Sequence, residues 1–354
     1  MKNVQVKTGA LLVLVLASLS LPGPVARAAE EPGQALIKAA IKGDVARARA
    51  LLDAGADPNL ADKNGKTPLW EAARHGKVDV VKLLLERHAD MELTDKGGDT
   101  PLRQGARHGN AGVVETLLRA EGDAAARHRD DRRLMAAACE GGSGDVVAQL
   151  VALGADVDAR DADGETPVFY AARSGKGGAI EALAAAHARI DVFSARNLTP
   201  LMVAAQTGHP DAVRALLRAG AQADLRNRDD NGWTAIMYAA AGTSSSTIDA
   251  LAEGGAAVNA DDAVHDLPIH IAARRSNGSV VRALLEHGAD ANCPSGSDHK
   301  TPLEIAVENG DRDVAAQLVS GGACVSPQMH NRAARKQDEK MLAVLSLARK
   351  CYRR

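Results

Sequence analysis

The residues that come closest to a chemical motif are basic pairs that recur at a fixed distance. The pairs and their equivalents are Arg74-His75, Arg107-His108, Arg173 and Arg274-Arg275. Imidazole is a common metal ligand at about 2 Å, but His75 and His108 belong to neighbouring copies of one repeat, whose backbones should lie about 10 Å apart. That separation makes one shared ion demanding, whereas arginine makes two-pronged contacts with carboxylates. The pairs therefore predict a protein-contact surface without a metal.

The sequence contains none of the common catalytic motifs. There is no Gly-x-Ser-x-Gly, no Gly-x-x-x-x-Gly-Lys-Ser/Thr phosphate loop and no His-Glu-x-x-His. We therefore expect a protein that is not an enzyme and that uses no cofactor. A metal-dependent enzyme that uses His75 and His108 is the remote alternative.

The amino terminus has the layout of a secretory signal peptide. Lys2 and Lys7 precede the apolar residues 10–17, and small residues follow at the two positions that a signal peptidase reads. We predict that residues 1–28 are a signal peptide cleaved after Ala28, which gives a periplasmic or secreted bacterial protein without stable membrane insertion. Cleavage removes three of the 43 basic residues and none of the 45 acidic ones. The mature chain is then mildly acidic, a balance that does not favour nucleic-acid binding.

The elements that carry these side chains follow a period of about 33 residues. Each copy begins at a Thr-Pro slot, and the slots fall at Thr67, Thr100, Arg133, Thr166, Thr199, Thr234, Leu267 and Thr301. Threonine is a good helix N-cap and proline suits the first helical position, so a short helix is expected after each slot. Two alanines and a glycine end that helix, and paired Val and Leu residues then predict a second one.

This pattern resembles the ankyrin repeat. The most complete match consists of Thr67-Pro68-Leu69, Ala72-Ala73, Gly76, Val80-Val81, Leu84-Leu85 and Ala89-Asp90. The resemblance extends over nearly all of the mature chain. It implies an all-α repeat solenoid of stacked helix-turn-helix units, joined by β-hairpin loops, with a concave binding face. It also implies that His270 fixes the neighbouring turn. Trp70, Phe169, Met202 and Met237 stand in the same slot, where we expect them to fill gaps between helices, and a ligand-binding box is the alternative.

The period divides the chain into three parts. We expect the signal peptide at residues 1–28, an array of about nine repeats at 29–331, and a C-terminal helical cap at 332–354. Arg133-Leu134 replaces Thr-Pro in the fourth repeat and follows a charged run, so we expect the array to bend or open at that junction.

Four cysteines would meet an oxidising compartment if the chain is exported. Cys139 falls on the second alanine of the pattern and should be a buried free thiol. Cys293, Cys324 and Cys351 lie toward the C-terminal end, and the sequence leaves open whether two of them form a disulfide.

The resemblance places partner binding on the loop tips and on the two residues after each Ala-Ala. The candidate partner-binding residues are Arg74, His75, Arg107, His108, Arg173, Arg274, Arg275, Lys63, Lys66, Lys96, Arg196, Leu198 and Trp233. Arginine recurs among them, so a partner with an acidic surface is expected. Acidic residues on the loops, Asp99 and Glu165 among them, offset part of this charge.

Leu198 and Trp233 share one loop slot in consecutive repeats. An exposed Trp beside a Leu would anchor a partner, and packing between loops is the alternative. Together the features predict a monomeric protein–protein interaction scaffold of the bacterial periplasm. The alternatives are an immunity or inhibitor protein for a periplasm-acting toxin or hydrolase, an accessory factor for a periplasmic enzyme, a secreted effector that binds host proteins, and a purely structural array.

Overall fold

Short helices in consecutive pairs make up the chain. The computed structural model describes residues 31–122, 131–229 and 231–350, and twenty helices lie within these ranges. They are α1 (Pro32–Lys42), α2 (Val45–Asp53), α3 (Pro68–Arg74), α4 (Val78–Glu86), α5 (Pro101–Arg107), α6 (Ala111–Glu121), α7 (Arg132–Gly141), α8 (Gly144–Ala152), α9 (Pro167–Ser174), α10 (Gly177–Ala185), α11 (Pro200–Thr207), α12 (Pro210–Arg218), α13 (Ala235–Ala241), α14 (Ser245–Glu253), α15 (Pro268–Arg274), α16 (Gly278–Glu286), α17 (Pro302–Asn309), α18 (Arg312–Ser320), α19 (Pro327–Arg335) and α20 (Glu339–Ser346).

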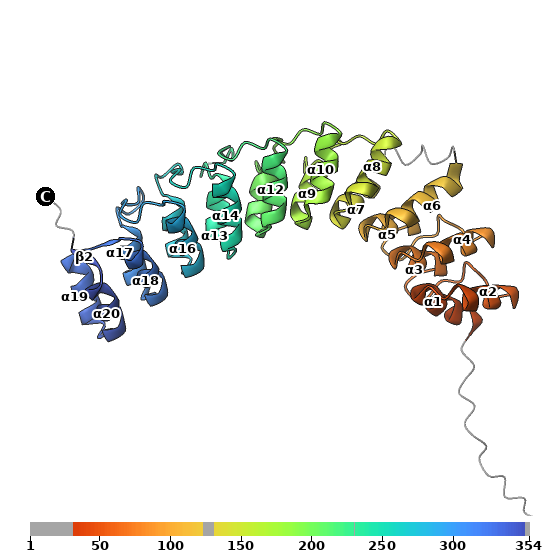
Figure 1. The fold of residues 1–354 in the computed structure, drawn as a ribbon, viewed down its shortest axis with the longest axis horizontal. Coiled ribbons are helices and arrows are strands. Elements are labelled where there is room, and N and C mark those ends of the chain that lie inside the picture. The colour runs from red at the N-terminus through yellow and green to blue at the C-terminus, as the bar shows by residue number, and fades with distance from the viewer. Residues whose placement is uncertain (1–30, 123–130, 230, 351–354) are drawn as a thin grey trace, which may run out of the picture.

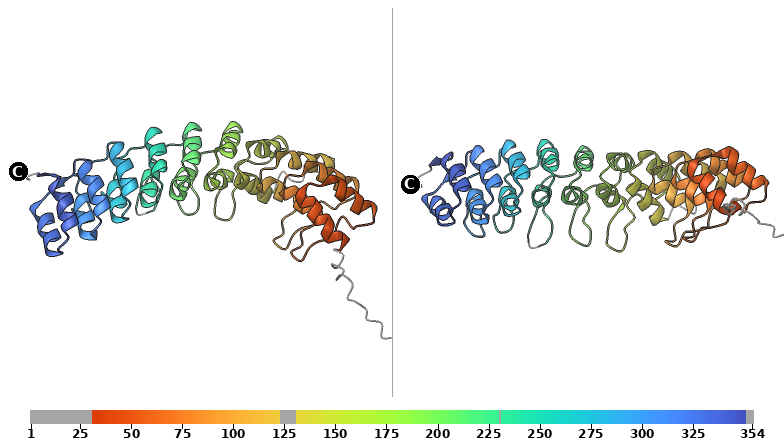
Figure 2. Two further views of the ribbon diagram at one scale, coloured as in Figure 1. Left: turned by 60° about the horizontal axis from the view of Figure 1, so that its bottom comes forward. Right: turned by 90° about the horizontal axis from the view of Figure 1, so that it is seen from below.

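The helix pairs stack side by side in two rows. Each odd-numbered helix packs on the odd-numbered helices before and after it, and the even-numbered helices do the same. The array follows one curved arc, with α1, α3 and α5 on its inner side (Figure 1). Figure 2 shows that the long loops between pairs project from the same side of the array. The predicted all-α repeat solenoid is confirmed.

Each odd-numbered helix of a regular repeat begins where the sequence provides a cap. In the second repeat, Thr67 Oγ1 accepts a hydrogen bond from the Trp70 N–H at 3.1 Å, and Pro68 is the first helical residue. Proline has no N–H to leave unsatisfied there, and its fixed φ suits a helix. Gly76 follows the helix with a φ of 68°, a left-handed conformation that strains residues with a β-carbon. The predicted start and stop of this helix are confirmed.

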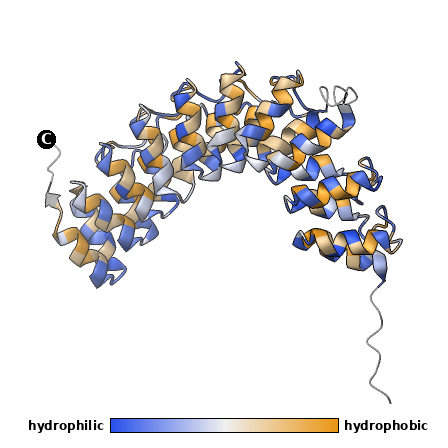
Figure 3. Cartoon of the chain, turned by 45° about the vertical axis from the view of Figure 1, so that its right-hand side comes forward, coloured by the Kyte–Doolittle hydropathy of each residue, from blue (hydrophilic) through white to orange (hydrophobic). Residues whose placement is uncertain are grey.

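One hydrophobic core runs through all ten pairs. Its buried side chains come from both rows, for example Leu69 and Ala73 of α3 and Val80, Val81 and Leu84 of α4. Figure 3 shows hydrophobic residues on every helix pair along the arc, not in one central cluster. Neighbouring repeats therefore bury each other, as a solenoid requires when one repeat cannot cover both of its faces.

The loops between pairs are closed by aspartate and by backbone hydrogen bonds. In the loop before α3, Asp62 Oδ1 accepts from the N–H groups of Asn64 and Lys66 at 2.8 and 2.9 Å. The Asp62 N–H donates to the Lys66 carbonyl, which closes the turn. The Lys96 N–H donates to the Asn64 carbonyl at 2.9 Å and joins this loop to the next one. The loops therefore turn as hairpins do and connect neighbouring repeats.

The fourth repeat departs from the predicted register. Helix α7 begins at Arg132, two residues before the place that the Thr-Pro slot would give it. Asp131 Oδ1 caps this helix by accepting from the N–H groups of Arg133 and Leu134 at 3.0 and 3.1 Å. Aspartate is a much better N-cap than arginine, so Arg133 lies inside the helix and does not take the capping role of Thr67.

A closing helix pair, α19 and α20, ends the array. The cap boundary expected at residue 332 falls inside α19, because Pro327 already provides a first helical residue. The strands found in the described ranges are β1 (Cys324–Val325) and β2 (Arg349–Lys350), which pair in parallel. The predicted signal peptide lies outside the described residues. Within the described ranges, no helix has the length and apolar character that crossing a membrane requires.

Candidate partner-binding groove

On the face predicted to bind, most repeats carry two side chains eight residues apart, which we call a groove pair. The first member is the last residue of the loop, and the second lies at or near the end of the odd-numbered helix. Helical side chains point back toward the helix N-terminus, so a long second side chain reaches the first. The groove pairs are Lys66 and Arg74, Asp99 and Arg107, Glu165 and Arg173, Leu198 and Gln206, Trp233 and Ala241, Asp266 and Arg274, and Lys300 and Glu308.

Four groove pairs are ion pairs. Arg107 contacts Asp99, and the nitrogen–oxygen distances are 2.7 Å for Glu165 and Arg173, 2.5 Å for Asp266 and Arg274, and 2.7 Å for Lys300 and Glu308. The carboxylate comes first in three of them, and the order is reversed in the last. Three of the arginines predicted to face a partner are therefore neutralised within their own repeats. They do not form an unopposed basic ladder.

Arg107 is bound on two sides. Besides Asp99, its Nε donates to Glu140 Oε2 of the next repeat at 3.1 Å. Burial acts against the charge on the guanidinium, but the hydrogen bonds to Asp99 and Glu140 outweigh it and raise the Arg107 pKa. This arginine ties two repeats together and stays charged.

The second repeat has cations at both positions of its groove pair. Lys66 Nζ lies 4.7 Å and Arg74 Cζ 5.8 Å from the centre of the Trp70 ring, distances at which a ring attracts a cation. Buried Glu71 lies 3.9 Å from Lys66 Nζ through Oε1 and 3.4 Å from His75 Nδ1 through Oε2. The N-terminal part of the groove therefore keeps more positive charge than the paired repeats.

The groove pairs of the sixth and seventh repeats carry no charge. Trp233 is half-buried, with its ring 5.3 Å from that of Tyr238 in an edge-on arrangement. Its indole N–H donates to Asp262 Oδ2 at 3.2 Å, and Leu198 is also half-buried against the core. The expected exposure of Trp233 is therefore wrong, because Tyr238 of the same repeat and Asp262 of the following loop hold the ring.

His75 and His108 lie at equivalent helix ends and face backbone oxygens. Their Nδ1 atoms are 3.0 and 3.1 Å from the carbonyl oxygens of Glu71 and Gln104. Across the described ranges, no group of three His, Cys, Asp or Glu side chains is placed to hold a metal ion. The two rings have the geometry of helix-end side chains.

Four predicted groove cations remain exposed. Lys63, Lys96, Arg196 and Arg275 are solvent-accessible, and none of them forms an ion pair with another described residue. They lie on three loops and at the end of α15. Their charge is available to a partner.

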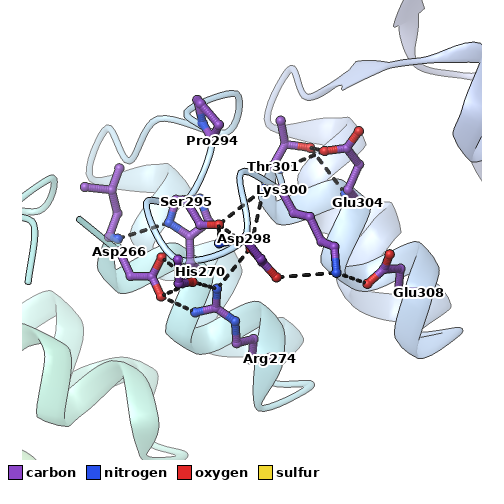
Figure 4. A network of polar contacts seen from close by, with 12 residues as sticks. Asp266, His270, Arg274, Pro294, Ser295, Asp298, Lys300, Thr301, Glu304 and Glu308 are labelled. Atoms are coloured by element: carbon purple, nitrogen blue, oxygen red, sulfur yellow. Dashed lines mark hydrogen bonds and ion pairs between the residues drawn. The ribbon is translucent and has the colours of Figure 1, made fainter. Parts of the chain in front are cut away.

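A polar network links the eighth and ninth repeats (Figure 4). Asp266 accepts from Arg274 at 2.5 Å and from the Ser297 hydroxyl at 3.1 Å. Lys300 lies between Asp298 and Glu308, at 3.4 and 2.7 Å. Its hydrogen bond to Glu308 raises the pKa of Lys300 and lowers that of Glu308. Opposite charges spaced eight residues apart are the signal that would have predicted these pairs.

His270 also belongs to this junction. Its Nδ1 accepts from the Leu267 N–H at 3.0 Å, so Nε2 carries the proton and donates to the Cys293 carbonyl at 2.8 Å. Burial lowers the pKa of His270 and keeps the ring neutral. The predicted role, fixing the neighbouring turn, is confirmed.

The cysteines divide into free and bonded ones. Cys139 is a buried free thiol, as predicted, and burial raises its pKa. Cys293 is also free, whereas Cys324 is disulfide-bonded. Cys351 lies outside the described residues.

The family follows from a comparison of the whole sequence with known families. The family model described as ankyrin repeats in three copies matches residues 36–130, 134–227, 177–262, 222–294 and 246–329, which together take in most of the chain. The chain belongs to the ankyrin-repeat family. Its Thr-Pro slots, Ala-Ala pairs and His270 are therefore ankyrin-repeat features, and this architecture supports a protein–protein interaction scaffold.

Individual ankyrin-repeat proteins match over short stretches. The NF-kappa-B inhibitor cactus of Drosophila melanogaster is 39% identical over 51 residues, 14% of this chain and 10% of that protein. Zygote-specific protein 3 of Chlamydomonas reinhardtii is 35% identical over 79 residues, 22% of this chain and 21% of that protein. The matches thus span a small part of either relative. The crystal structure of the human ASB11 ankyrin repeat domain is 26% identical, with a TM-score of 0.43, and covers 72% of this chain and 98% of that one.

Proposed function

We propose that this ankyrin-repeat protein is a non-catalytic scaffold that binds a protein partner along the groove face, in the bacterial periplasm after removal of residues 1–28. The observation that carries the proposal is the contrast within the groove. Arg107, Arg173 and Arg274 are satisfied by carboxylates of the same array, whereas Lys63, Lys96, Arg196 and Arg275 remain exposed without an ion pair among the described residues.

The chemistry of those four cations favours a partner with an acidic surface. Internal ion pairs fix the neighbouring arginines, so the partner does not have to break them to approach. Complementary charge at exposed positions steers encounter and selects partners. The four lie on separate repeats, so the partner must extend along the array to meet them all.

The test compares two variants with the same loss of charge. The groove variant carries Lys63→Ala, Lys96→Ala, Arg196→Ala and Arg275→Ala. The control variant carries four substitutions of exposed cations on the even-numbered helices: Lys82→Ala, Arg119→Ala, Arg218→Ala and Arg282→Ala. Each protein is immobilised and exposed to a periplasmic extract of the source bacterium.

We expect one protein to be captured by the parent and the control variant and lost by the groove variant, with capture weakening as salt is raised. Equal capture by both variants, or capture that is insensitive to salt, contradicts binding through these cations. The identity of the captured protein separates the alternatives, because an immunity or inhibitor protein binds a toxin or hydrolase and an accessory factor binds an enzyme that it activates.

The location has its own test. The full chain is produced in a bacterium, the cells are fractionated, and the N-terminus of the protein is sequenced. We expect a periplasmic protein that begins at Ala29. A cytoplasmic protein that keeps residues 1–28 would contradict export.

A further inference from the structure

One position of the repeat links the odd-numbered helix to the following loop in the two repeats where a ring with an N–H occupies it. This position, which we call the gap slot, lies three residues after the Thr-Pro slot. Its occupants along the chain are Ile37, Trp70, Arg103, Ala136, Phe169, Met202, Met237, His270 and Glu304. All of them are large except Ala136.

Two gap-slot rings show what the space accepts. Trp70 and His270 are 3% and 0% exposed. The indole N–H of Trp70 donates to the Asp99 carbonyl at 3.2 Å, and Nε2 of His270 donates to the Cys293 carbonyl at 2.8 Å. In both repeats a planar ring fills the gap and gives one N–H to a carbonyl of the following loop.

At Ala136 the same space is a cavity. It has a volume of about 200 Å³ and lies between α7 and the loop that precedes α9, with Met135, Ala136 and Tyr170 in its lining. Ala159 and Glu165 also line it. Ala159 stands at the position of Cys293, counted from the Ala-Asp of each loop, and Glu165 stands at the position of Asp99, directly before the Thr-Pro slot. The backbone positions that receive the ring N–H in the other repeats are therefore present here.

The charged groups around this cavity already have partners. Asp161 accepts from the Tyr170 hydroxyl at 2.5 Å, and Glu165 accepts from Arg173 at 2.7 and 2.9 Å. Arg132 donates to the Arg160 carbonyl at 2.9 Å. Asp156, which also lines the cavity, accepts from the Asp158 N–H at 2.9 Å. Because each of these charged groups already has a hydrogen-bond partner in the protein, a bound group does not have to supply one, and a neutral group suits the cavity. A cavity of about 150 Å³ with an apolar lining is large enough to bind benzene.

We propose that the cavity beside Ala136 is a binding site for one neutral planar aromatic ring that carries an N–H group, such as indole. The bound ring takes the place that Trp70 and His270 take in their own repeats, and its N–H donates to a carbonyl of the loop at residues 155–165. The site lies at a repeat junction and does not depend on the groove cations, so it stands or falls separately from the function proposed above.

The test uses indole as the probe and the Met135 methyl group as the reporter. The full-length protein is labelled with ¹³C at its methionine methyls, and indole is titrated while the spectra are recorded. We expect saturable ring-current shifts of Met135, with a dissociation constant of about 1 mM or below, as suits a ligand of so few atoms. Met202 and Met237, buried in other gap slots, should not move.

Three comparisons make the result specific. Indene has the shape of indole without the N–H, and it should bind roughly fivefold more weakly if one hydrogen bond is lost. Ala136→Trp should abolish the Met135 shifts by filling the cavity. Ala136→Leu fills less of it and should weaken the shifts, and this variant replaces Ala136→Trp if the larger substitution disturbs folding. Trp70→Ala should create a second indole site in the second repeat.

The outcomes separate clearly. The proposal is wrong if indole does not shift Met135 at any concentration up to its solubility limit but does bind the Trp70→Ala variant. It is also wrong if Ala136→Trp leaves indole binding unchanged. N-acetyltryptophanamide identifies the source of the ring. If it binds as indole does, the site takes a tryptophan side chain of another protein, and if only indole binds, the site takes a free small molecule.

Discussion

The junction between repeats eight and nine and the junction between repeats four and five are built on the same pattern but are filled differently. At the first, His270 is fully buried, with both ring nitrogens hydrogen-bonded, beside the polar network of Figure 4. At the second, Ala136 leaves a cavity of about 200 Å³. The helix α7 before it is capped by Asp131 and starts early.

This difference shows that one set of residues fixes the helix boundaries and another fixes the contacts between repeats. Capping residues and glycines decide where helices begin and end, and both junctions have well-formed helices. One side chain per repeat then decides how firmly a helix holds the next loop. In a repeat array, stability is the sum of the repeats and of their interfaces, so a single gap slot sets the strength of one junction without changing the others.

The largest effect is expected at the filled junction. His270→Ala should destabilise the protein by about 3 kcal/mol, because it opens a cavity and leaves the Leu267 N–H and the Cys293 carbonyl without their partner. Denaturant unfolding followed by circular dichroism measures the loss, and amide hydrogen exchange places it at this junction. His88→Asn, at an exposed histidine with a φ of 60°, is the control and should change little. A loss below about 1 kcal/mol would contradict a holding role for the ring.

The open junction should respond with the opposite sign. Ala136→Phe should stabilise the protein by about 1 kcal/mol, the usual gain from filling a cavity. Phe169 occupies the same slot in the next repeat, where it is fully buried, so the substitution fits the repeat geometry. Amide exchange should slow in α7 and α9 and stay unchanged in α15. Destabilisation would mean that the walls around Ala136 cannot accept a ring.

The sequence predicted what depends on local pattern. The caps, the terminating glycines and the holding role of His270 follow from residues within a few positions of each other. It did not predict that Asp131 would cap α7, because the repeat period places the start of this helix at Arg133 and not at the better N-cap two residues earlier. It left open whether Trp233 is exposed or packed, and the structure shows it half-buried. That depends on Tyr238 and on Asp262 of the following loop, a neighbour that one repeat read alone does not reveal.

The sequence contains part of the information that predicts the groove pairs. An acid on the loop stands eight residues before an arginine in three repeats, and Lys300 and Glu308 repeat the spacing with the charges exchanged, so this spacing predicts the four ion pairs. The cavity beside Ala136 is harder to predict from the sequence. A small residue in one gap slot predicts a vacancy only when the register of α7 and the position of the next loop are known.

A charge reversal at the open junction tests whether the groove pairs hold repeats by charge alone. Glu165→Lys and Arg173→Glu should each cost about 1 kcal/mol, since each single change places like charges together. The double variant should recover to within about 0.5 kcal/mol of the parent, because Lys300 and Glu308 already form the pair in that order. Denaturant unfolding of all four proteins gives the coupling. No recovery in the double variant would show that the position of each charge matters, and not only the pair.

The smallest effect distinguishes the two junctions by pH. Burial holds the pKa of His270 below its ordinary value of 6.5, so between the two pKa values the unfolded chain binds a proton more readily than the folded one. The stability that the neutral ring contributes is complete well above pH 6.5 and is lost as the pH falls below that value. His270→Met puts a methionine in the gap slot, as Met202 and Met237 do in their own repeats. This variant should lose this part of the pH dependence. Ala136→Phe should leave the slope of stability against pH unchanged, because the open junction has no titrating ring. An equal slope in the parent and in His270→Met would assign the pH dependence to other groups.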